Sequence, residues 1–475
     1  MAASPVQSRK TGRKAVTACD RCYELKERCA RISSVIACTR CRRLGTNCTN
    51  LRPLRRAGRR PFHSARESTS IGQSITSSRS SIDFDTWLSE SPDLSCDEKD
   101  LLLLLLTRPE YSEHYPVSPA FQAADQKSLA AALIVALPIL KHAYLAYAGA
   151  LKLLRYGTAA EAEKSVSLRH ASFAMNTLRS LPVSNSQDAA TCLALGAPLA
   201  LFVYSVVGVG VADICHFSLS TVSPFLNMRN SDLDSDTSPW QNVLVMLETM
   251  ECLVYRRKAT LRIQSDGPEM IDRYLGLCVP LLPFYYDLCN ISYLQSQSTE
   301  RGCLNHLRKQ LEGVHSAIQT WQPSQPCGFI ERFQTAEVVN LLAQARVYRL
   351  AGLLVCHRLR YVFGEEDSQA SLLSREIMME LGLARGISKA RIRCVTLPFV
   401  VAAVEVEGEE NRIKALRNVD EFVDQFTPVV QNATRTFLQR VWHERDVQGI
   451  ACWFDSVHKP CAVLDSIESS YFALA

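Results

Sequence analysis

Residues 19–48 have the sequence CDRCYELKERCARISSVIACTRCRRLGTNC, with six cysteines in the spacing C-x2-C-x6-C-x8-C-x2-C-x6-C. The cysteines are Cys19, Cys22, Cys29, Cys38, Cys41 and Cys48. The spacing contains the same half-site twice, and each half supplies three thiols. A doubled C-x2-C pattern is typical of zinc sites, because Zn2+ prefers soft ligands in a tetrahedral arrangement. Two such ions need eight ligand positions, so six thiolates satisfy them only if two thiolates bridge the ions.

A disulfide framework is the alternative explanation for six cysteines in a short segment. Such a framework requires an oxidising compartment. Residues 1–8 lack the charged start and apolar run of a secretory signal. We therefore expect the chain to stay in the cytosol or nucleus, where zinc is favoured over disulfides.

Charge is distributed unevenly along the chain. Residues 1–66 contain 17 Lys and Arg against 3 Asp and Glu, whereas the rest contains 36 against 45. The formal net charge of +5 therefore combines an N-terminal excess of +14 with a remainder of −9. Positive charge concentrated on a small metal-binding segment favours a phosphate backbone as the partner. We expect double-stranded DNA, bound in a way that weakens as salt increases.

The six-cysteine spacing inside this basic stretch resembles the fungal Zn2Cys6 binuclear-cluster transcription factors. In that family the first and fourth cysteines bridge the two metal ions, so the resemblance assigns bridging to Cys19 and Cys38. It also implies two Zn2+ as cofactors and a location in the nucleus. One ion would be held by Cys19, Cys22, Cys29 and Cys38, and the other by Cys38, Cys41, Cys48 and Cys19.

The resemblance implies DNA contacts as well. In the family, a lysine four residues after the second cysteine contacts a CGG-type triplet, and Lys26 occupies that position. A cationic donor suits guanine, whose major-groove edge presents two acceptors. The chain departs from many members at Tyr23 and Leu25, where they carry Arg or Lys. The other DNA contacts we expect are Arg28, Arg21, Arg40, Arg42, Arg43, Arg55, Arg56, Arg59 and Arg60.

Composition divides the chain into four parts. Residues 49–96 are first basic, then rich in Ser and finally acidic, which is typical of a disordered linker. No apolar heptad runs between residues 51 and 95, so we expect no coiled coil there. The expected parts are a basic N-terminal arm at 1–18, a Zn2Cys6 DNA-binding domain at 19–48, this linker at 49–96 and an all-helical regulatory domain at 97–475.

Acidic and large apolar residues alternate at the end of the linker, and two interpretations stay open. The composition is that of an acidic activation segment. The same stretch contains Ser95, followed three positions later by Glu98, which is typical of a capping box at the start of a helix. The two interpretations are compatible.

The remainder of the chain has the apolar periodicity of helices. Apolar residues recur at helical spacing in residues 129–154, 243–254, 338–359 and 422–441, separated by prolines and glycines. Residues 189–212 are uncharged over 24 positions, long enough to cross a bilayer, but Gly196, Pro198, Gly208 and Gly210 interrupt them. We expect a buried helix pair there and no membrane partner. The expected fold class is a small binuclear zinc-cluster domain followed by a large all-α regulatory region.

Known catalytic motifs are missing from the sequence, including G-x-S-x-G, Walker A and H-E-x-x-H. We therefore expect no enzymatic activity, with a catalytic helical region that lacks a recognisable motif as the weaker alternative. The resemblance to the Zn2Cys6 family implies a sequence-specific RNA polymerase II regulator, with metabolic or secondary-metabolite genes as the expected targets because many members control such genes. A non-specific zinc-dependent nucleic-acid-binding protein is the main alternative. The sequence leaves open whether the helical region serves homodimerisation, binding of a co-regulator or binding of a small-molecule effector.

Overall fold

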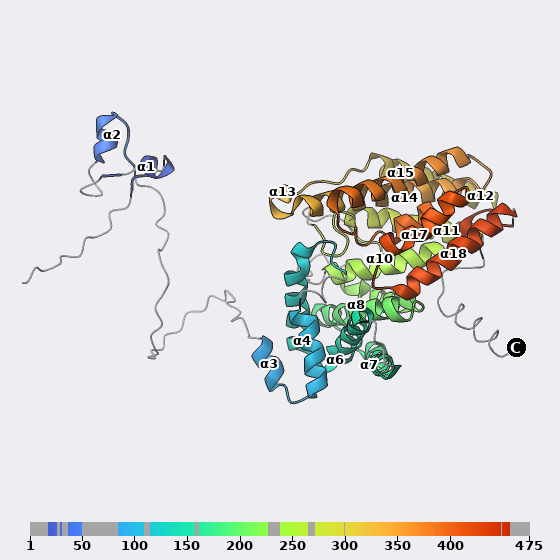
Figure 1. The fold of residues 1–475 in the computed structure, drawn as a ribbon, viewed down its shortest axis with the longest axis horizontal. Helices are drawn as coiled ribbons and strands as arrows, with labels where there is room; N and C mark the ends of the chain where they lie inside the picture. The colour runs from blue at the N-terminus through green and yellow to red at the C-terminus, as the bar shows by residue number, and fades with distance from the viewer. Residues whose placement is uncertain are drawn as a thin grey trace, which may run out of the picture. The chain divides into compact units, whose positions relative to one another are not determined.

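The computed structural model describes residues 18–25, 29–30, 37–49, 84–108, 115–156, 161–226, 238–264, 271–298, 300–447 and 449–456. The chain forms two compact units, residues 1–80 and residues 81–475. Figure 1 shows the helices of both units, coloured in chain order. The boundary between the units lies inside the segment that the sequence assigns to the linker, so the helical unit begins earlier in the chain than residue 97.

Two short helices form the described part of the first unit. Helix α1 spans Asp20–Glu24 and helix α2 spans Thr39–Arg43, and each begins one residue after the first cysteine of its half-site. Cys38 is the N-cap of α2, because its Sγ accepts a hydrogen bond from the Cys41 amide at 3.4 Å. A cysteine sulfur therefore takes the place of the oxygen that usually caps a helix.

Two reciprocal hydrogen bonds join the halves of this unit. The Asp20 amide donates to the Thr49 carbonyl at 3.0 Å, and the Thr39 amide donates to the Ala30 carbonyl at 3.1 Å. Positions 20 and 39 are equivalent in the repeated half-site, as are positions 30 and 49. The unit is therefore pseudo-twofold symmetric, and each half is closed by a residue of the other half.

The second unit is built from helices. They are α3 (Phe84–Glu90), α4 (Cys96–Thr107), α6 (Gln122–Tyr156), α7 (Glu161–Ser180), α8 (Ser186–Val206), α9 (Val211–Leu226), α10 (Ser238–Tyr255), α11 (Leu282–Gln297), α12 (Arg301–Thr320), α13 (Phe329–Arg332), α14 (Thr335–Arg360), α15 (Asp367–Ser388), α16 (Thr396–Ala403), α17 (Glu409–Phe422) and α18 (Pro428–Asp446), with the 3-10 turns η1 (Pro119–Phe121), η2 (Val279–Leu281) and η3 (Trp453–Asp455). The described residues contain no strand, and one isolated antiparallel bridge joins Asp272 and Gly276. The expected all-α region is confirmed for the part of the chain that the structure describes.

The helices of the second unit share one continuous apolar core. Helix α8 packs against α6, α9 and α10, while α14 packs against α12, α15 and α16. Helix α11 contacts both α10 and α14, so it connects these two groups (Figure 1). Tyr285 of α11 donates a hydrogen bond to the Tyr348 carbonyl of α14 at 2.7 Å inside the core. The core therefore extends without interruption from one helix group to the other.

The start of α4 has the local structure that the sequence predicts. The Glu98 amide donates to the Ser95 hydroxyl, and the Glu98 carboxylate accepts from the Ser95 amide at 2.8 Å, which completes a capping box. The capped-helix interpretation is therefore confirmed. Helix α3, just before it, buries Leu88 against the core.

The long uncharged stretch forms one buried helix, α8, and the first two residues of α9, so the expectation of a helix pair within residues 189–212 is wrong although its burial is confirmed. Gly208 and Gly210, both at φ 78°, separate the two helices, whereas α8 continues through Gly196 and Pro198. Gly196 lies against Ser218 of α9 so closely that a Cβ would clash there. The glycine is needed because only a residue without a side chain permits this approach.

Three helices are long and apolar enough to cross a membrane by length and composition alone, within residues 119–155, 186–206 and 335–360. Buried residues make up 83% of the most apolar window of α8 and 67% of that of α14. The apolar surfaces of these two helices are therefore mostly occupied by neighbouring helices of the same unit.

The predicted helical stretches agree with the structure except at two places. One is Ala136, whose non-helical backbone, with φ −134° and ψ 40°, kinks α6 within residues 129–154. Residues 129–154, 243–254 and 338–359 lie within α6, α10 and α14. The expectation for residues 422–441 is wrong at its start, because α17 ends at Phe422 and α18 begins at Pro428. Proline cannot donate an amide hydrogen bond and disfavours helical backbone in the residue before it, here Thr427. The chain therefore turns between two helices where apolar periodicity alone predicted one.

Candidate metal centre

Four cysteines bring their sulfurs together in the first unit. Cys19, Cys22, Cys38 and Cys41 are buried, and their Sγ atoms all lie within 4.8 Å of one another. Three of the distances are 3.8 Å, namely Cys19 to Cys38, Cys19 to Cys41 and Cys22 to Cys38. This cluster is the core of the unit, with Cys29 and Cys48 packed against it.

These distances fit tetrahedral zinc. A zinc–sulfur bond of about 2.3 Å places two sulfurs of one regular tetrahedron about 3.8 Å apart. Each of the three 3.8 Å distances joins two sulfurs that the family resemblance assigns to the same ion. The donor set therefore fits the predicted metal in both chemistry and spacing.

Cys29 and Cys48 occupy equivalent positions in the two halves. The Cys19 amide donates to the Cys29 sulfur at 3.5 Å, and the Cys38 amide donates to the Cys48 sulfur at 3.4 Å. Amide donors stabilise a thiolate, because they place partial positive charge on the sulfur. The third cysteine of each half is thus turned toward the first cysteine of the same half.

The thiols differ in acidity. A backbone hydrogen bond from Cys41 lowers the pKa of Cys38 to about 6. Burial raises the pKa of Cys19, but hydrogen bonds from Cys22 and Cys48 outweigh it, and the pKa is lowered. The hydrogen bond with Cys38 raises the pKa of Cys41 to about 12, and burial raises the pKa of Cys22. The two most acidic thiols of the four are therefore Cys19 and Cys38, the pair to which the resemblance assigns bridging.

One zinc ion also fits part of this arrangement. The four buried sulfurs all lie within 4.8 Å of one another, a spacing compatible with a single ion held by Cys19, Cys22, Cys38 and Cys41. Cys29 and Cys48 would then act only as neighbours of that ion. The number of bound ions therefore separates the two arrangements.

The arginines expected to contact DNA divide into three groups. Arg21, Arg42 and Arg43 are exposed, and the last two lie in the final turn of α2. Arg40, also in α2, is partly buried. Outside the described residues lie Lys26, Arg28, Arg55, Arg56, Arg59 and Arg60.

The described residues thus divide between a small unit built around a cysteine cluster that could hold a metal ion and a large helical unit. Residues 115–464 match the model of the fungal specific transcription factor domain, which covers 350 of the 475 residues. The chain therefore belongs to the fungal specific transcription factor domain family and is a transcription regulator. No curated protein and no solved structure matches the chain.

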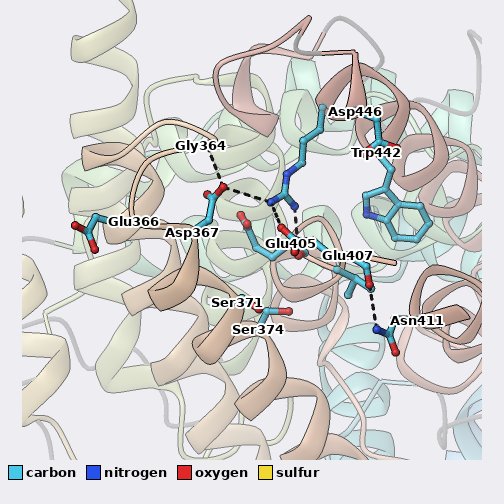
Figure 2. Close-up of polar contacts among 12 residues, drawn as sticks. Gly364, Glu366, Asp367, Ser371, Ser374, Glu405, Glu407, Asn411, Trp442 and Asp446 are labelled. Atoms are coloured by element: carbon cyan, nitrogen blue, oxygen red, sulfur yellow. Dashed lines mark hydrogen bonds and ion pairs between the residues drawn. The ribbon is translucent and has the colours of Figure 1, made fainter. Parts of the chain in front are cut away.

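The helical unit contains a buried ion network that sequence reasoning missed. The side chain of Arg358 in α14 is fully buried and donates to both carboxylate oxygens of Glu405, at 2.8 and 2.7 Å. It also donates to Asp367 at 2.6 Å, at the first position of α15. In Figure 2, Asp367 and Glu405 converge from different elements, and the Gly364 amide bonds to Asp367 at 2.9 Å.

This network joins parts of the chain that are distant in sequence. The Arg358 guanidinium lies over the Phe363 ring, 4.8 Å from its centroid, and so does that of Arg445 in α18. Arg445 donates in turn to Glu407 at 2.7 Å. These ion pairs and ring contacts therefore connect four helices: the ends of α14, α16 and α18 and the start of α15. Apolar periodicity carries no signal for it, because its members are paired by tertiary structure alone.

A pocket of about 690 Å3 opens beside this network, between α12, α14 and α15. His315 and Arg308 line it from α12, and His357 and Arg360 line it from α14. Glu312 pairs with Arg360 at 3.4 Å. The volume falls in the range that accommodates small ligands.

Proposed function

We propose that this transcription regulator binds DNA sequence-specifically in the nucleus, through a Zn2Cys6 cluster formed by residues 19–48, and controls genes read by RNA polymerase II. The sulfur spacing carries the proposal, because three Sγ pairs lie at the edge length of a zinc–thiolate tetrahedron. The six predicted ligands are Cys19, Cys22, Cys29, Cys38, Cys41 and Cys48.

Zinc has a structural role in this proposal. The ions supply the cross-links around which a segment too short for its own apolar core folds. Cys19 and Cys38 bridge the two ions, and the 3.8 Å between their sulfurs fits two ligands that both tetrahedra share. The amides that point at the sulfurs hold the ligands in place for the metal.

The basic residues around the cluster supply DNA contacts. Helix α2 carries three arginines and no acidic residue, which suits it to a phosphate backbone. Lys26 is the proposed base-reading residue, and its preferred element is of the CGG type. The phosphate contacts we propose are Arg21, Arg28, Arg40, Arg42, Arg43, Arg55, Arg56, Arg59 and Arg60. Such contacts orient the cluster, whereas base contacts give the sequence preference.

The helical unit has the regulatory role, with homodimerisation, co-regulator binding and effector binding as the candidate activities. The pocket between α12, α14 and α15 is the candidate effector site, because its volume suits a small molecule and its lining carries charges of both signs, with Arg308 and Arg360 beside Glu312 and Glu365. Metabolic or secondary-metabolite genes are the proposed targets. No membrane partner and no enzymatic activity are proposed.

Selection of sites from a random DNA pool by the full chain with zinc tests the DNA proposal. We expect enrichment of a CGG-containing motif that is lost in Lys26→Ala. The control is Lys414→Ala, which removes an exposed lysine of α17 in the helical unit. Loss of the motif in both variants, or a motif that Lys26→Ala leaves unchanged, would contradict base reading by Lys26. Salt-sensitive binding without an enriched motif would support the non-specific alternative.

Zinc stoichiometry tests the cluster itself. We expect about two zinc ions per chain by elemental mass spectrometry, because six thiolates with two bridges satisfy two tetrahedra. Cys29→Ser should lower the zinc content, whereas Cys96→Ser, at an exposed cysteine in α4, should leave it unchanged. One ion per chain that survives Cys29→Ser and Cys48→Ser would support the four-cysteine site.

A further inference from the structure

Helix α15 carries a row of exposed apolar side chains. Leu372, Met379, Leu383 and Ile387 are 55, 55, 54 and 66% exposed. The opposite side of the helix is buried against α14 and α16. Figure 1 shows α15 along the outer edge of the helical unit. A helix that is buried on one side and exposes four large apolar side chains on the other is suited to a second packing partner.

The exposed residues have the spacing of a helix-pairing seam. Ser368, Leu372, Arg375, Met379, Gly382 and Gly386 are all exposed and follow one another at alternating steps of four and three, so the line is apolar or small except at Ser368 and Arg375. Leu383 and Ile387 flank this line on the same side. Steps of this kind keep one stripe of side chains facing a neighbouring helix along its whole length.

Two glycines in the same seam have no close neighbour among the described residues. Gly382 and Gly386 lie one helical turn apart, and a Cβ at either position would meet no atom within 4 Å. Glycine weakens a helix interior relative to alanine, and here no neighbour in the described structure requires it. Close approach of another helix does require small residues at a contact point, so the glycines suit an interface.

The two ends of α15 carry opposite charge. Glu365 and Glu366 are exposed at its start, whereas Lys389 and Arg391 are exposed at its end. Two copies of the helix aligned in antiparallel orientation place each acidic start beside a basic end. The helix dipoles favour the same orientation. A parallel pair would instead place like charges together at both ends.

We propose that the α15 face, defined by Leu372, Met379, Gly382, Leu383, Gly386 and Ile387, packs against the α15 face of a second copy of this chain in antiparallel orientation. A twofold axis passes near Met379, close to the middle of the helix. Such an interface is isologous, because both chains contribute the same residues and each contact therefore occurs twice. The proposal deepens the regulatory role proposed for the helical unit and does not depend on DNA binding.

The start of α15 is fixed in a way that suits a docking surface. Asp367, its first residue, accepts hydrogen bonds from the buried Arg358 and from the Gly364 amide. Exposed Arg346 of α14 pairs with Glu376 at 3.0 Å and Glu380 at 3.3 Å along the flank of the helix. The helix is therefore held rigidly from behind, so little order is lost when its outer face binds.

Sedimentation of the zinc-loaded full chain, without DNA, tests the proposal. We expect a concentration-dependent dimer whose dissociation constant rises at least about tenfold in Ile387→Glu, because a charge enters an apolar contact. The matched control is Val135→Glu on α6, since Val135 is also 66% exposed but lies outside the α15 face. Far-UV circular dichroism establishes that both variants keep the helical fold.

A charge exchange tests the orientation. Glu366→Lys and Lys389→Glu should each weaken dimerisation, because like charges then meet twice in each homodimer. Mixing the two variants should restore dimers, since both contacts become attractive in the heterodimer. If the dimer dissociation constant does not change with these charges, the antiparallel arrangement is overturned.

Two results would overturn the α15 face as a self-association surface. One is a wild-type chain that stays monomeric at up to about 100 µM, which would leave the face to a different protein. The other is a dimer that Ile387→Glu does not weaken. Failure of the DNA-site selection leaves this inference standing, because the sedimentation measurement contains no DNA.

Discussion

The two units of this chain acquire structure by different physical means. In the first unit the only buried apolar cluster of the described residues consists of cysteines, whereas the second unit has a continuous core of leucine, valine and aromatic side chains. A segment without an apolar core depends on its metal ligands for folding, but a large helical unit is stabilised by burial of its own side chains. We therefore expect the fold of the first unit to depend on bound metal and that of the second unit to be independent of it.

Metal removal should produce the largest difference in folding between the two units. We expect a zinc chelator to unfold residues 18–49 while the helical unit stays folded, because structural zinc contributes about 10–16 kcal/mol in small domains. Trypsin cleavage at Arg21, Arg40 and Arg42, followed by mass spectrometry, detects the first effect, and far-UV circular dichroism detects the second. Cys38→Ser should reproduce the cleavage, and Cys96→Ser should not. Extensive loss of helicity on chelation would contradict the comparison.

Within the helical unit, the largest single effect should come from its buried charges. Arg358→Met leaves Glu405 buried without its partner, so we expect a loss of about 3–5 kcal/mol in the free energy of unfolding. Urea denaturation measures it. The control is Arg346→Met, at a half-exposed ion pair with Glu376, which should change stability by less than about 1 kcal/mol. Equal losses of unfolding free energy in the two variants would show that burial of the ion pair does not determine the energetic cost of breaking it.

Glycine substitutions should show how tightly the second unit is packed. Gly276 has φ 58°, and a Cβ there would lie 2.8 Å from Leu341 and 2.7 Å from Gln344. Gly276→Ala should therefore cost about 1–3 kcal/mol. A Cβ on Gly313, within α12, meets nothing within 4 Å, so Gly313→Ala should stabilise the unit by up to about 1 kcal/mol. Thermal unfolding distinguishes the two signs, and a destabilising Gly313→Ala would contradict this reasoning.

The smallest predicted effect is a pH dependence of the core. Burial raises the pKa of Asp424, although Tyr204 and Thr396 donate hydrogen bonds to its carboxylate at 2.9 and 3.1 Å. Because the folded pKa lies above that of the unfolded chain, the folded state binds the proton more tightly, and stability falls as pH rises between the two values.

Asp424→Asn should remove this contribution, which amounts to no more than about 1.4 kcal/mol per pH unit. Urea unfolding at a series of mildly acidic pH values measures the slope. Asp188→Asn, at a partly exposed residue in the first turn of α8, serves as the control. An unchanged slope in Asp424→Asn would show that this carboxyl does not titrate in that range.

Much of the fold could be predicted because its signals are local. Ligand spacing identified the cysteine cluster, periodicity located α6, α10 and α14, and the pair Ser95 and Glu98 marked the start of α4. The division between α17 and α18 was also present in the sequence, as Pro428, but apolar periodicity concealed it.

Other features depend on pairs that only the folded chain brings together. Arg358 and Glu405 are 47 positions apart, and no local pattern connects them. The α15 face could not be predicted for a related reason. Large apolar side chains lie on both sides of α15, so apolar periodicity does not show which side is exposed. The reciprocal hydrogen bonds of the first unit involve backbone atoms, which carry no residue-specific signal.

The pseudo-twofold frame of the first unit carries unequal charge on its two equivalent helices. Helix α1 contains Asp20 and Glu24 with a single arginine, whereas α2 contains three arginines and no acidic residue. A symmetric frame charged on one side has an electric dipole. In the field of a polyanion such an object experiences a torque before any contact forms. If the unit binds DNA as proposed, this difference between its two duplicated halves would orient it during approach, before any base is contacted.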